Sequence, residues 1–266
     1  MKISAYGYLF NARKFSFNIE ETVANFCAFF DDVVCATVPS EDDTREVLTE
    51  MEKKYSNFRV IDSDIKILGN NRFDGQLKTL AMKNCANEIR VIVDYDEKFI
   101  LTQRPIWNNL ATHLVNSPQI DGFLIPVLNL FGSKDKIKAN ENIGQKFRIH
   151  KKTVVERGVV KEAELGNGLF RTDISDSTEA LVWGRKLANF ATLIDPLRLN
   201  PIFAQNLINY PYVVHFGDLD LERRAKIGRE FWAKAWSERS GKPENVITDA
   251  KELDNVQVIS HNLPIS

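Results

Sequence analysis

The chain has 266 residues, of which 44% are hydrophobic and 27% are charged, as is usual for one globular domain or a domain with an added subdomain. Lys and Arg number 35 and Asp and Glu 36, so the net charge of -1 gives no field that would concentrate nucleic acid or anionic lipid. The three cysteines show no C-x-x-C spacing and no apolar run approaches the about 20 residues that span a bilayer, so we expect a cytoplasmic protein with reduced thiols, no nucleic-acid partner and no transmembrane segment.

Short β-rich runs alternate with helical patterns over the first hundred residues, which predicts α/β units with a mostly parallel sheet covered by helices on both faces. A strand is predicted over 2–10, and Asn18 is predicted to cap the helix that follows. The next predicted elements are a buried strand over 32–38, a helix over 45–55, a strand over 58–61, a helix over 75–84 and a strand over 89–93.

Beyond residue 100 the pattern is less regular. The predicted elements are a helix over 105–115, a strand over 122–130, a charged loop over 134–142, a hairpin or two edge strands over 146–160, a short strand over 212–215 and a long amphipathic helix over 219–239. Residues 241–266 show little periodicity and are predicted to form a surface tail.

The sharpest motif is Ile92-Val93-Asp94-Tyr95-Asp96-Glu97, in which an apolar strand ends in two carboxylates separated by one residue. Ligands of open α/β sheets bind at the carboxyl ends of the strands, so we expect Asp94 and Asp96 to project into the site. Mg²⁺ and Mn²⁺ prefer oxygen ligands and commonly combine one or two carboxylates with substrate phosphates, which predicts a divalent metal at this motif. A second D-x-D at 62–64 keeps open the alternative of acids in a solvated turn.

Segments of residues 1–100 resemble, in order and spacing, the family 2 glycosyltransferases of the GT-A fold, especially bacterial members with a D-A-D-E signature. They are the opening strand with Asn11-Ala12-Arg13, DDVVCATVPSEDDTRE, RFDGQLKTLAMKNC and IVDYDEKF, and VVHFG at 213–217 is similar to the family's H-[YF]-G element. The resemblance implies a nucleotide-diphospho-sugar transferase-like sheet with a less regular C-terminal region. Residues 1–100 would form the nucleotide-sugar-binding half, 101–240 the acceptor-side half, and 241–266 the tail.

The resemblance also implies roles for residues around the nucleotide. Asn11 and Arg13 would face the base and ribose, and Asp42 would border the same pocket. Asp74 would contact the base and Lys78 the diphosphate, where its ammonium and the nearby helix N-terminus both favour phosphate. The alternatives are a solvated helix lysine for Lys78 and a helix cap for Asp42. VPS at 38–40 stands where the family carries an acidic pair, so the sequence does not determine which nucleotide base is recognised.

The implied reaction moves a sugar from a nucleotide-sugar, with a UDP-sugar favoured, to a hydroxyl of a glycan, lipid-linked or small acceptor, with Mn²⁺ or Mg²⁺. Asp94 would serve both nucleotide and metal, and His215 would complete the metal shell or bind phosphate, unless it simply packs under the C-terminal helix. An inverting transferase needs a carboxylate base, for which Asp173 and Asp176 are preferred, ahead of Glu179 and Glu156.

Two other functions stay open. A nucleotidyltransferase on a similar sheet would want a Gly-rich phosphate loop near the first strand, which LFNARKF lacks. A non-catalytic nucleotide-sugar-binding protein would keep the sheet and lack the base, which is the part that the sequence does not locate.

Overall fold

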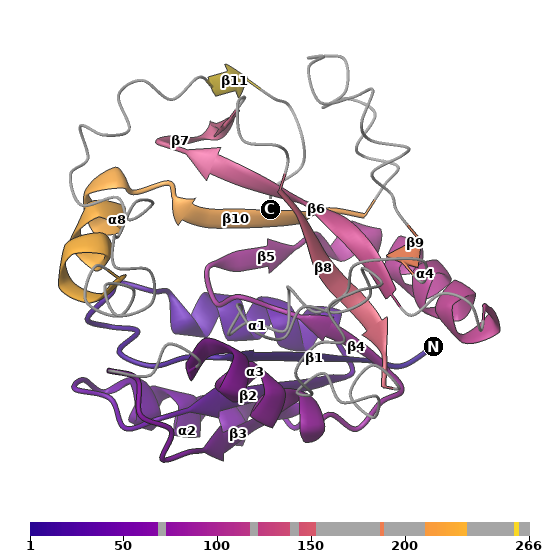
Figure 1. The fold of residues 1–266 in the computed structure, drawn as a ribbon, viewed down its shortest axis with the longest axis horizontal. Coiled ribbons are helices and arrows are strands. Elements are labelled where there is room, and N and C mark those ends of the chain that lie inside the picture. Colours follow the sequence, from indigo (N-terminus) through magenta and orange to yellow (C-terminus); the bar gives the residue numbers. More distant parts are fainter. Residues whose placement is uncertain are drawn as a thin grey trace, which may run out of the picture.

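The computed structural model describes residues 1–68, 73–117, 122–138, 144–152, 187–188, 211–232 and 258–260 (Figure 1). Within these residues the strands form a single sheet of 11 strands. No helix of the described residues is both long and apolar enough to cross a membrane.

The N-terminal half is a parallel sheet with the strand order β3-β2-β1-β4. Its central strand is β1, where Tyr6 lies opposite Val34 on one side and Ile92 on the other. The elements of this half, in chain order, are β1 (Ile3–Tyr8), α1 (Ile19–Phe29), β2 (Asp32–Thr37), α2 (Thr44–Lys54), β3 (Phe58–Asp62), α3 (Phe73–Lys83) and β4 (Ile89–Ile92).

The second half continues the same sheet but pairs largely antiparallel. Strand β8 lies between β4 and β6 and is antiparallel to both, and β10 pairs in parallel with β6 and antiparallel with β5. The elements are β5 (Glu97–Phe99), the 3₁₀ turn Leu101–Gln103, α4 (Arg104–Asn116), β6 (Gly122–Phe131), β7 (Ser133–Lys138), β8 (Gly144–Lys151), β9 (Leu187–Ala188), β10 (Val213–Asp218), α8 (Leu221–Ile227), the π-helical turn Gly228–Trp232 and β11 (Val258–Ser260).

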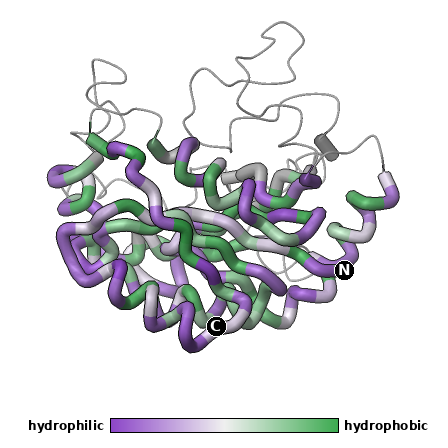
Figure 2. The backbone as a smooth tube through the Cα atoms, turned by 90° about the horizontal axis from the view of Figure 1, so that it is seen from below, coloured by the Kyte–Doolittle hydropathy of each residue, from purple (hydrophilic) through white to green (hydrophobic). Residues whose placement is uncertain are grey.

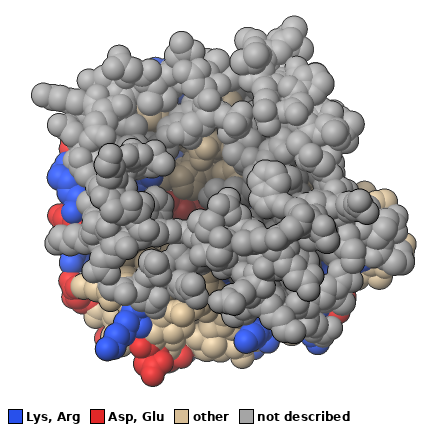
Figure 3. All heavy atoms as spheres, in the orientation of Figure 1, with Lys and Arg blue, Asp and Glu red and all other residues tan. Residues whose placement is uncertain are grey.

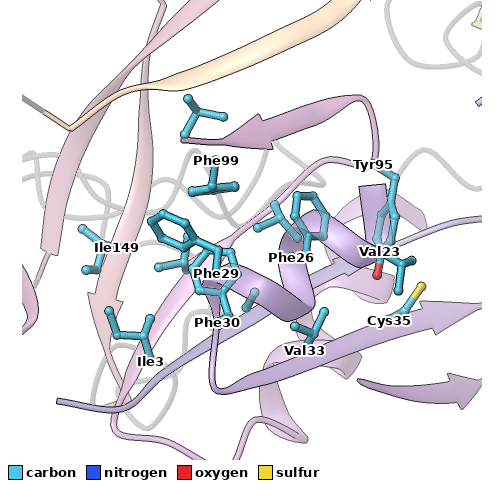
Figure 4. Close-up of a cluster of buried hydrophobic side chains, with 14 of the residues drawn as sticks. Ile3, Val23, Phe26, Phe29, Phe30, Val33, Cys35, Tyr95, Phe99 and Ile149 are labelled. Atoms are coloured by element: carbon cyan, nitrogen blue, oxygen red, sulfur yellow. The ribbon is translucent and has the colours of Figure 1, made fainter. Parts of the chain in front are cut away.

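Alternating residues of β1 enter two separate cores, as the two-residue period of a strand requires. Ile3 and Ala5 belong to a core with side chains of α1, α2 and α4, whereas Tyr6 belongs to a core with side chains of α3 and α8. Figure 4 shows the first of these cores, where Phe26, Phe29 and the strand residue Phe99 pack together. The sheet is therefore covered on both faces, and Figure 2 shows hydrophobic backbone segments running through its middle.

The α/β class predicted from the sequence is confirmed, as is Asn18 as the N-cap of α1, where its side chain accepts a hydrogen bond from the Glu21 amide. The parallel pairing is concentrated in the first half. The predicted helices and strands up to residue 93 all occur, with bounds shifted by a few residues.

Two predictions for the second half were wrong. The segment predicted as a charged loop over 134–142 begins with β7, because the buried Ile137 pairs with β6 even though the three residues before it are exposed. A hairpin or two edge strands were predicted over 146–160, but β8 is an interior strand with partners on both sides, and residues 153–160 lie outside the described part of the chain. Of the predicted surface tail over 241–266, the structure describes only 258–260, which form β11 and pair with β7. Residues 233–239 of the predicted long helix lie outside the described residues.

Candidate active site

The predicted acids lie where the strand order of the parallel sheet reverses. Strand β2 follows β1 on one side, whereas β4 lies on the other side of β1, so the carboxyl ends of β1 and β4 flank a topological switch point. Crevices at such points are the ligand sites of open α/β sheets. Figure 3, in the orientation of Figure 1, shows described basic side chains next to acidic ones along the left and lower edges of the molecule.

Asp94 is separated from the end of β4 by Val93 and is held by two cations. Its Oδ1 atom is 3.1 Å from Nζ of Lys78, and its Oδ2 atom is 3.3 Å from a terminal nitrogen of Arg148. The Asp94 amide also donates a 3.0 Å hydrogen bond to Oε2 of Glu97. Both ends of this residue are therefore fixed, and its carboxylate is only partly exposed.

Arg148 lies on β8 and is fully buried. The surrounding sequence predicts the strand but not the burial of this arginine. Its guanidinium contacts Asp94 and the equally buried Glu97, and it donates a 3.3 Å hydrogen bond to the carbonyl of Ile92. Lys78, which is 4% exposed, completes a cluster of two cations and two carboxylates. A buried charge requires such partners, because removing one partner of a buried ion pair lowers the free energy of unfolding by about 3–5 kcal/mol.

Asp96 pairs with His215 rather than with this cluster. Its Oδ2 atom is 3.2 Å from Nε2 of His215, which lies on β10, and its carbonyl accepts a 2.7 Å hydrogen bond from the Phe216 amide. Burial acts to raise the pKa of Asp96, but the charge and hydrogen bond of His215 outweigh it and lower that pKa to about 2. Asp96 is therefore an ionised carboxylate at neutral pH.

Gly217 makes this pair sterically possible. A Cβ atom at Gly217 would lie 2.4 Å from Cε1 and 2.7 Å from Nε2 of His215, and 3.0 Å from Oδ2 of Asp96. The missing side chain leaves room for the imidazole, which gives the H-F-G segment a physical reason for its glycine.

The Asp96 and His215 pair fits a divalent cation as two adjacent ligands. Two ligand atoms about 2.1 Å from one ion and at right angles lie about 3 Å apart, close to the 3.2 Å observed between Oδ2 and Nε2. No group of three His, Cys, Asp or Glu side chains in the described residues is arranged to hold a metal by itself, so Asp94 does not complete a three-residue site. Mg²⁺ commonly takes its remaining ligands from water and substrate phosphates.

Residues predicted to lie around the nucleotide base connect the loops after β1 and β2 through hydrogen bonds and ion pairs. Asn11 adopts a left-handed backbone conformation (φ 47°), and its side-chain oxygen accepts a 2.7 Å hydrogen bond from the Glu41 amide. Asp42 accepts hydrogen bonds from the amides of Lys14 (2.7 Å) and Thr44 (3.0 Å), so it orders the entry to α2. Arg13 pairs with Glu20 and lies 3.8 Å from Asp43.

The remaining predicted residues divide between described and undescribed parts of the chain. Asp74 lies in the first turn of α3, and its side chain is outside the described set. Asp173 and Asp176, predicted as candidates for the base, lie outside the described residues. The second D-x-D sits elsewhere, at the end of β3, where Asp62 is exposed and accepts hydrogen bonds from Arg45 at 2.7 and 2.8 Å.

Sequence reasoning missed Arg148 and Arg223. The Arg223 side chain, from α8, donates a 2.9 Å hydrogen bond to the Phe15 carbonyl and stacks 4.6 Å from the Phe17 ring centroid, which ties α8 to the loop after β1. The only sequence signal for Arg148 is an arginine within an alternating strand pattern.

No protein-family model and no curated protein sequence matches this chain. Among solved structures, it is similar to S. aureus TarS 1-349 in complex with UDP-GlcNAc, with a TM-score of 0.43 and 16% identity over 59% of this chain and 47% of that one. The mannosyltransferase PcManGT from Pyrobaculum calidifontis, in complex with GDP-Man and Mn²⁺, gives a TM-score of 0.48 and 15% identity over 95% and 69% of the two chains.

The glucosyl-3-phosphoglycerate synthase from Mycobacterium tuberculosis, in complex with Mn²⁺ and UDP-glucose, gives a TM-score of 0.33 and 16% identity over 48% of this chain and 43% of that one. The chain thus spans about half the length of the TarS complex and of this synthase. Because these TM-scores lie below 0.5, we infer function from the site itself.

Proposed function

We propose that this chain is a glycosyltransferase that moves a sugar from a nucleotide-sugar to an acceptor hydroxyl, with Mn²⁺ or Mg²⁺ bound at Asp96 and His215. The observation that carries the proposal is the 3.2 Å contact between these two side chains beside the Lys78–Asp94 pair, at the switch point of a parallel sheet. The resemblance of residues 1–100 to family 2 glycosyltransferases supports the same reaction.

The site offers complementary charge for a nucleoside diphosphate. Lys78 lies on α3 with its ammonium next to Asp94, where it can turn to a phosphate oxygen in a charge-assisted hydrogen bond. A bound cation would neutralise the charge that develops on the diphosphate as the sugar leaves. Asp96 and His215 would hold that cation, and the diphosphate oxygens would supply its other ligands.

Asp94 has a separate role in this proposal. Its carboxylate is engaged by Lys78 and Arg148, so its oxygens serve as hydrogen-bond acceptors for hydroxyls of the donor rather than as metal ligands. Asn11, Arg13 and Asp42 border the base side of the site, and a UDP-sugar remains the favoured donor.

The acceptor side lies in the second half of the chain. Asp173 or Asp176 is the proposed base that takes the proton of the attacking hydroxyl, which gives an inverting transfer. The acceptor is a glycan, a lipid-linked sugar or a small hydroxyl compound.

Donor turnover tests this function. The protein is incubated with UDP- and GDP-sugars, Mn²⁺ and a panel of hydroxyl acceptors, and released nucleoside diphosphate is measured. Metal-dependent release of UDP or GDP, abolished in Asp96→Ala, is the expected result. Release of pyrophosphate from a nucleoside triphosphate would instead indicate a nucleotidyltransferase, and donor binding without turnover in any arm would indicate a binding protein.

A further inference from the structure

Arg148 reaches the site from a strand that carries none of the predicted site residues. Strand β8 is inserted between β4 and β6, and Figure 1 shows the end of β8 reaching β4. The guanidinium that contacts Asp94 therefore belongs to an interior strand of the sheet. It is 0% exposed, so it does not itself present a surface to a ligand.

The contacts of Arg148 and Glu97 form a closed ring around Asp94. Arg148 contacts Oδ2 of Asp94 and Oε1 of Glu97, while Oε2 of Glu97 accepts the Asp94 amide hydrogen at 3.0 Å. The same guanidinium binds the Ile92 carbonyl at 3.3 Å, which fixes it to the last residue of β4. Each member of the ring is thus held by the other two.

The ring leaves one oxygen of Asp94 facing Lys78. Oδ2 is turned inward to Arg148, and Oδ1 is 3.1 Å from Nζ of Lys78. The side chain of Asp94 keeps 23% exposure, whereas Arg148 and Glu97 have none. In the described site the fully buried pair Arg148 and Glu97 therefore supports the partly exposed carboxylate of Asp94, which contacts Lys78.

We propose that Arg148 is a positioning residue that, together with Glu97, orients Asp94 and through it Lys78 for the nucleotide, independently of the metal pair Asp96 and His215. The inference rests on the proposed function, because the nucleotide is the ligand that this half of the site serves. Preorganisation by a locked supporting layer is what keeps a binding group in a productive geometry.

Two variants remove the ring in different ways. Arg148→Lys keeps one buried cation but loses the planar fork, in which one terminal nitrogen contacts both carboxylates and the other donates to the Ile92 carbonyl. A single ammonium on a shorter fork-less side chain cannot hold these three groups in the same geometry. Arg148→Met combined with Glu97→Gln removes one charge of each sign, so no unpaired charge of this pair is buried, and the introduced glutamine still offers an oxygen to the Asp94 amide. If the double variant fails to fold, Arg148→Lys carries the test.

Lys151→Met is the matched control. Lys151 is a buried cation on the same strand β8, and its ammonium donates a 2.8 Å hydrogen bond to the Ser117 carbonyl, away from the Asp94 ring. Its loss costs stability, as the loss of any buried hydrogen bond does, without touching the nucleotide side.

The experiment measures two affinities in each folded variant, for Mn²⁺ alone and for UDP or GDP, whichever the wild type binds, at saturating Mn²⁺. We expect Arg148→Lys and the double variant to weaken nucleotide binding about tenfold, an effect typical of supporting-layer changes, with the Mn²⁺ affinity unchanged. Lys151→Met should change neither affinity.

Three outcomes would overturn the inference. Unchanged nucleotide affinity in both Arg148 variants would leave the proposed function standing and remove the positioning role. An equal loss of Mn²⁺ and nucleotide affinity would mean a merely structural contribution. A wild-type protein that binds neither UDP nor GDP would remove the proposed function and this inference together.

Discussion

A Cβ atom on Gly217 would lie 2.4 Å from Cε1 of His215, so this glycine and this imidazole occupy a space that tolerates only one side chain. The contact links the H-F-G segment of β10 directly to Asp96, whose Oδ2 atom is 3.2 Å from the same ring. It makes the backbone at residue 217 part of the site.

Gly217→Ala should therefore displace His215 from Asp96. We expect Mn²⁺ affinity to fall about tenfold, while the far-UV circular dichroism stays the same. Isothermal titration with Mn²⁺ measures the loss. His215→Ala is the partner in a double-mutant cycle: once the ring is absent, adding Gly217→Ala should cause a smaller loss than in the wild type, because only the 3.0 Å contact with Oδ2 of Asp96 remains. Additive losses would show that Gly217 acts by another route.

Lys78→Met removes the cation next to Asp94 and should weaken binding of UDP or GDP. A charge-assisted hydrogen bond contributes about 1.5–3 kcal/mol, which corresponds to about tenfold or more in affinity. Lys83→Met is the control, because Lys83 is an exposed lysine of the same helix. Equal nucleotide affinities in the two variants would support the alternative that Lys78 only balances the charge of Asp94.

Gly7 marks a second close approach, between β1 and the end of β4. A Cβ atom there would lie 2.4 Å from the Val93 carbonyl oxygen, a backbone atom that cannot move without shifting Asp94. We expect Gly7→Ala to lower the free energy of unfolding by about 1–3 kcal/mol, as overpacking does, in urea denaturation. Gly132→Asn is the control, since nothing lies within 4 Å of a Cβ there and asparagine tolerates its positive φ. Wild-type stability of Gly7→Ala would contradict the contact.

His150 should make stability depend on pH. In the neutral ring Nδ1 donates a 2.9 Å hydrogen bond to the Lys151 carbonyl, so Nε2 accepts a 2.8 Å hydrogen bond from the Tyr6 hydroxyl. His150 is fully buried, and burial lowers its pKa from 6.5 to about 4. The unfolded chain therefore binds a proton below pH 6.5 that the folded protein takes up only near pH 4. The free energy of unfolding is therefore highest above pH 6.5. It falls by about 3 kcal/mol as the pH is lowered from 6.5 to about 4.

Urea unfolding between pH 4 and 7 measures this dependence. His150→Gln should flatten it, because glutamine takes up no proton. A slope that is identical in the wild type and the variant would assign the pH dependence to other groups.

The sequence predicted best the features that are local along the chain. The apolar run at 89–93 followed by two acids placed Asp94 and Asp96 at the end of a strand, and that position depends only on neighbouring residues. The capping by Asn18 is local in the same sense. Lys78 was predicted beside the diphosphate, and the structure adds that its ammonium contacts Asp94.

Arg148 could not be predicted, because its partner Asp94 is 54 residues away and their contact depends on which strands β8 lies between. Nothing in KFRIHK specifies that order. The same reason explains why β7 was missed. The charged residues 134–136 predict a loop, and the strand forms because Ile137 pairs with Leu130 of β6, seven residues away in sequence. The different partners of Asp94 and Asp96 also depend on distant strands, since Asp96 contacts His215 only because β5 pairs with β10.

Mn²⁺ binding by Asp96 is the most direct measurement. Free Mn²⁺ is followed by electron paramagnetic resonance during titration of the wild type, Asp96→Ala and, as the control, Asp64→Ala from the second, exposed D-x-D. We predict that the wild type and Asp64→Ala bind the ion and that Asp96→Ala does not, with its circular dichroism unchanged. An Asp96→Ala protein that binds Mn²⁺ with wild-type affinity would contradict the assignment of the metal to Asp96 and His215.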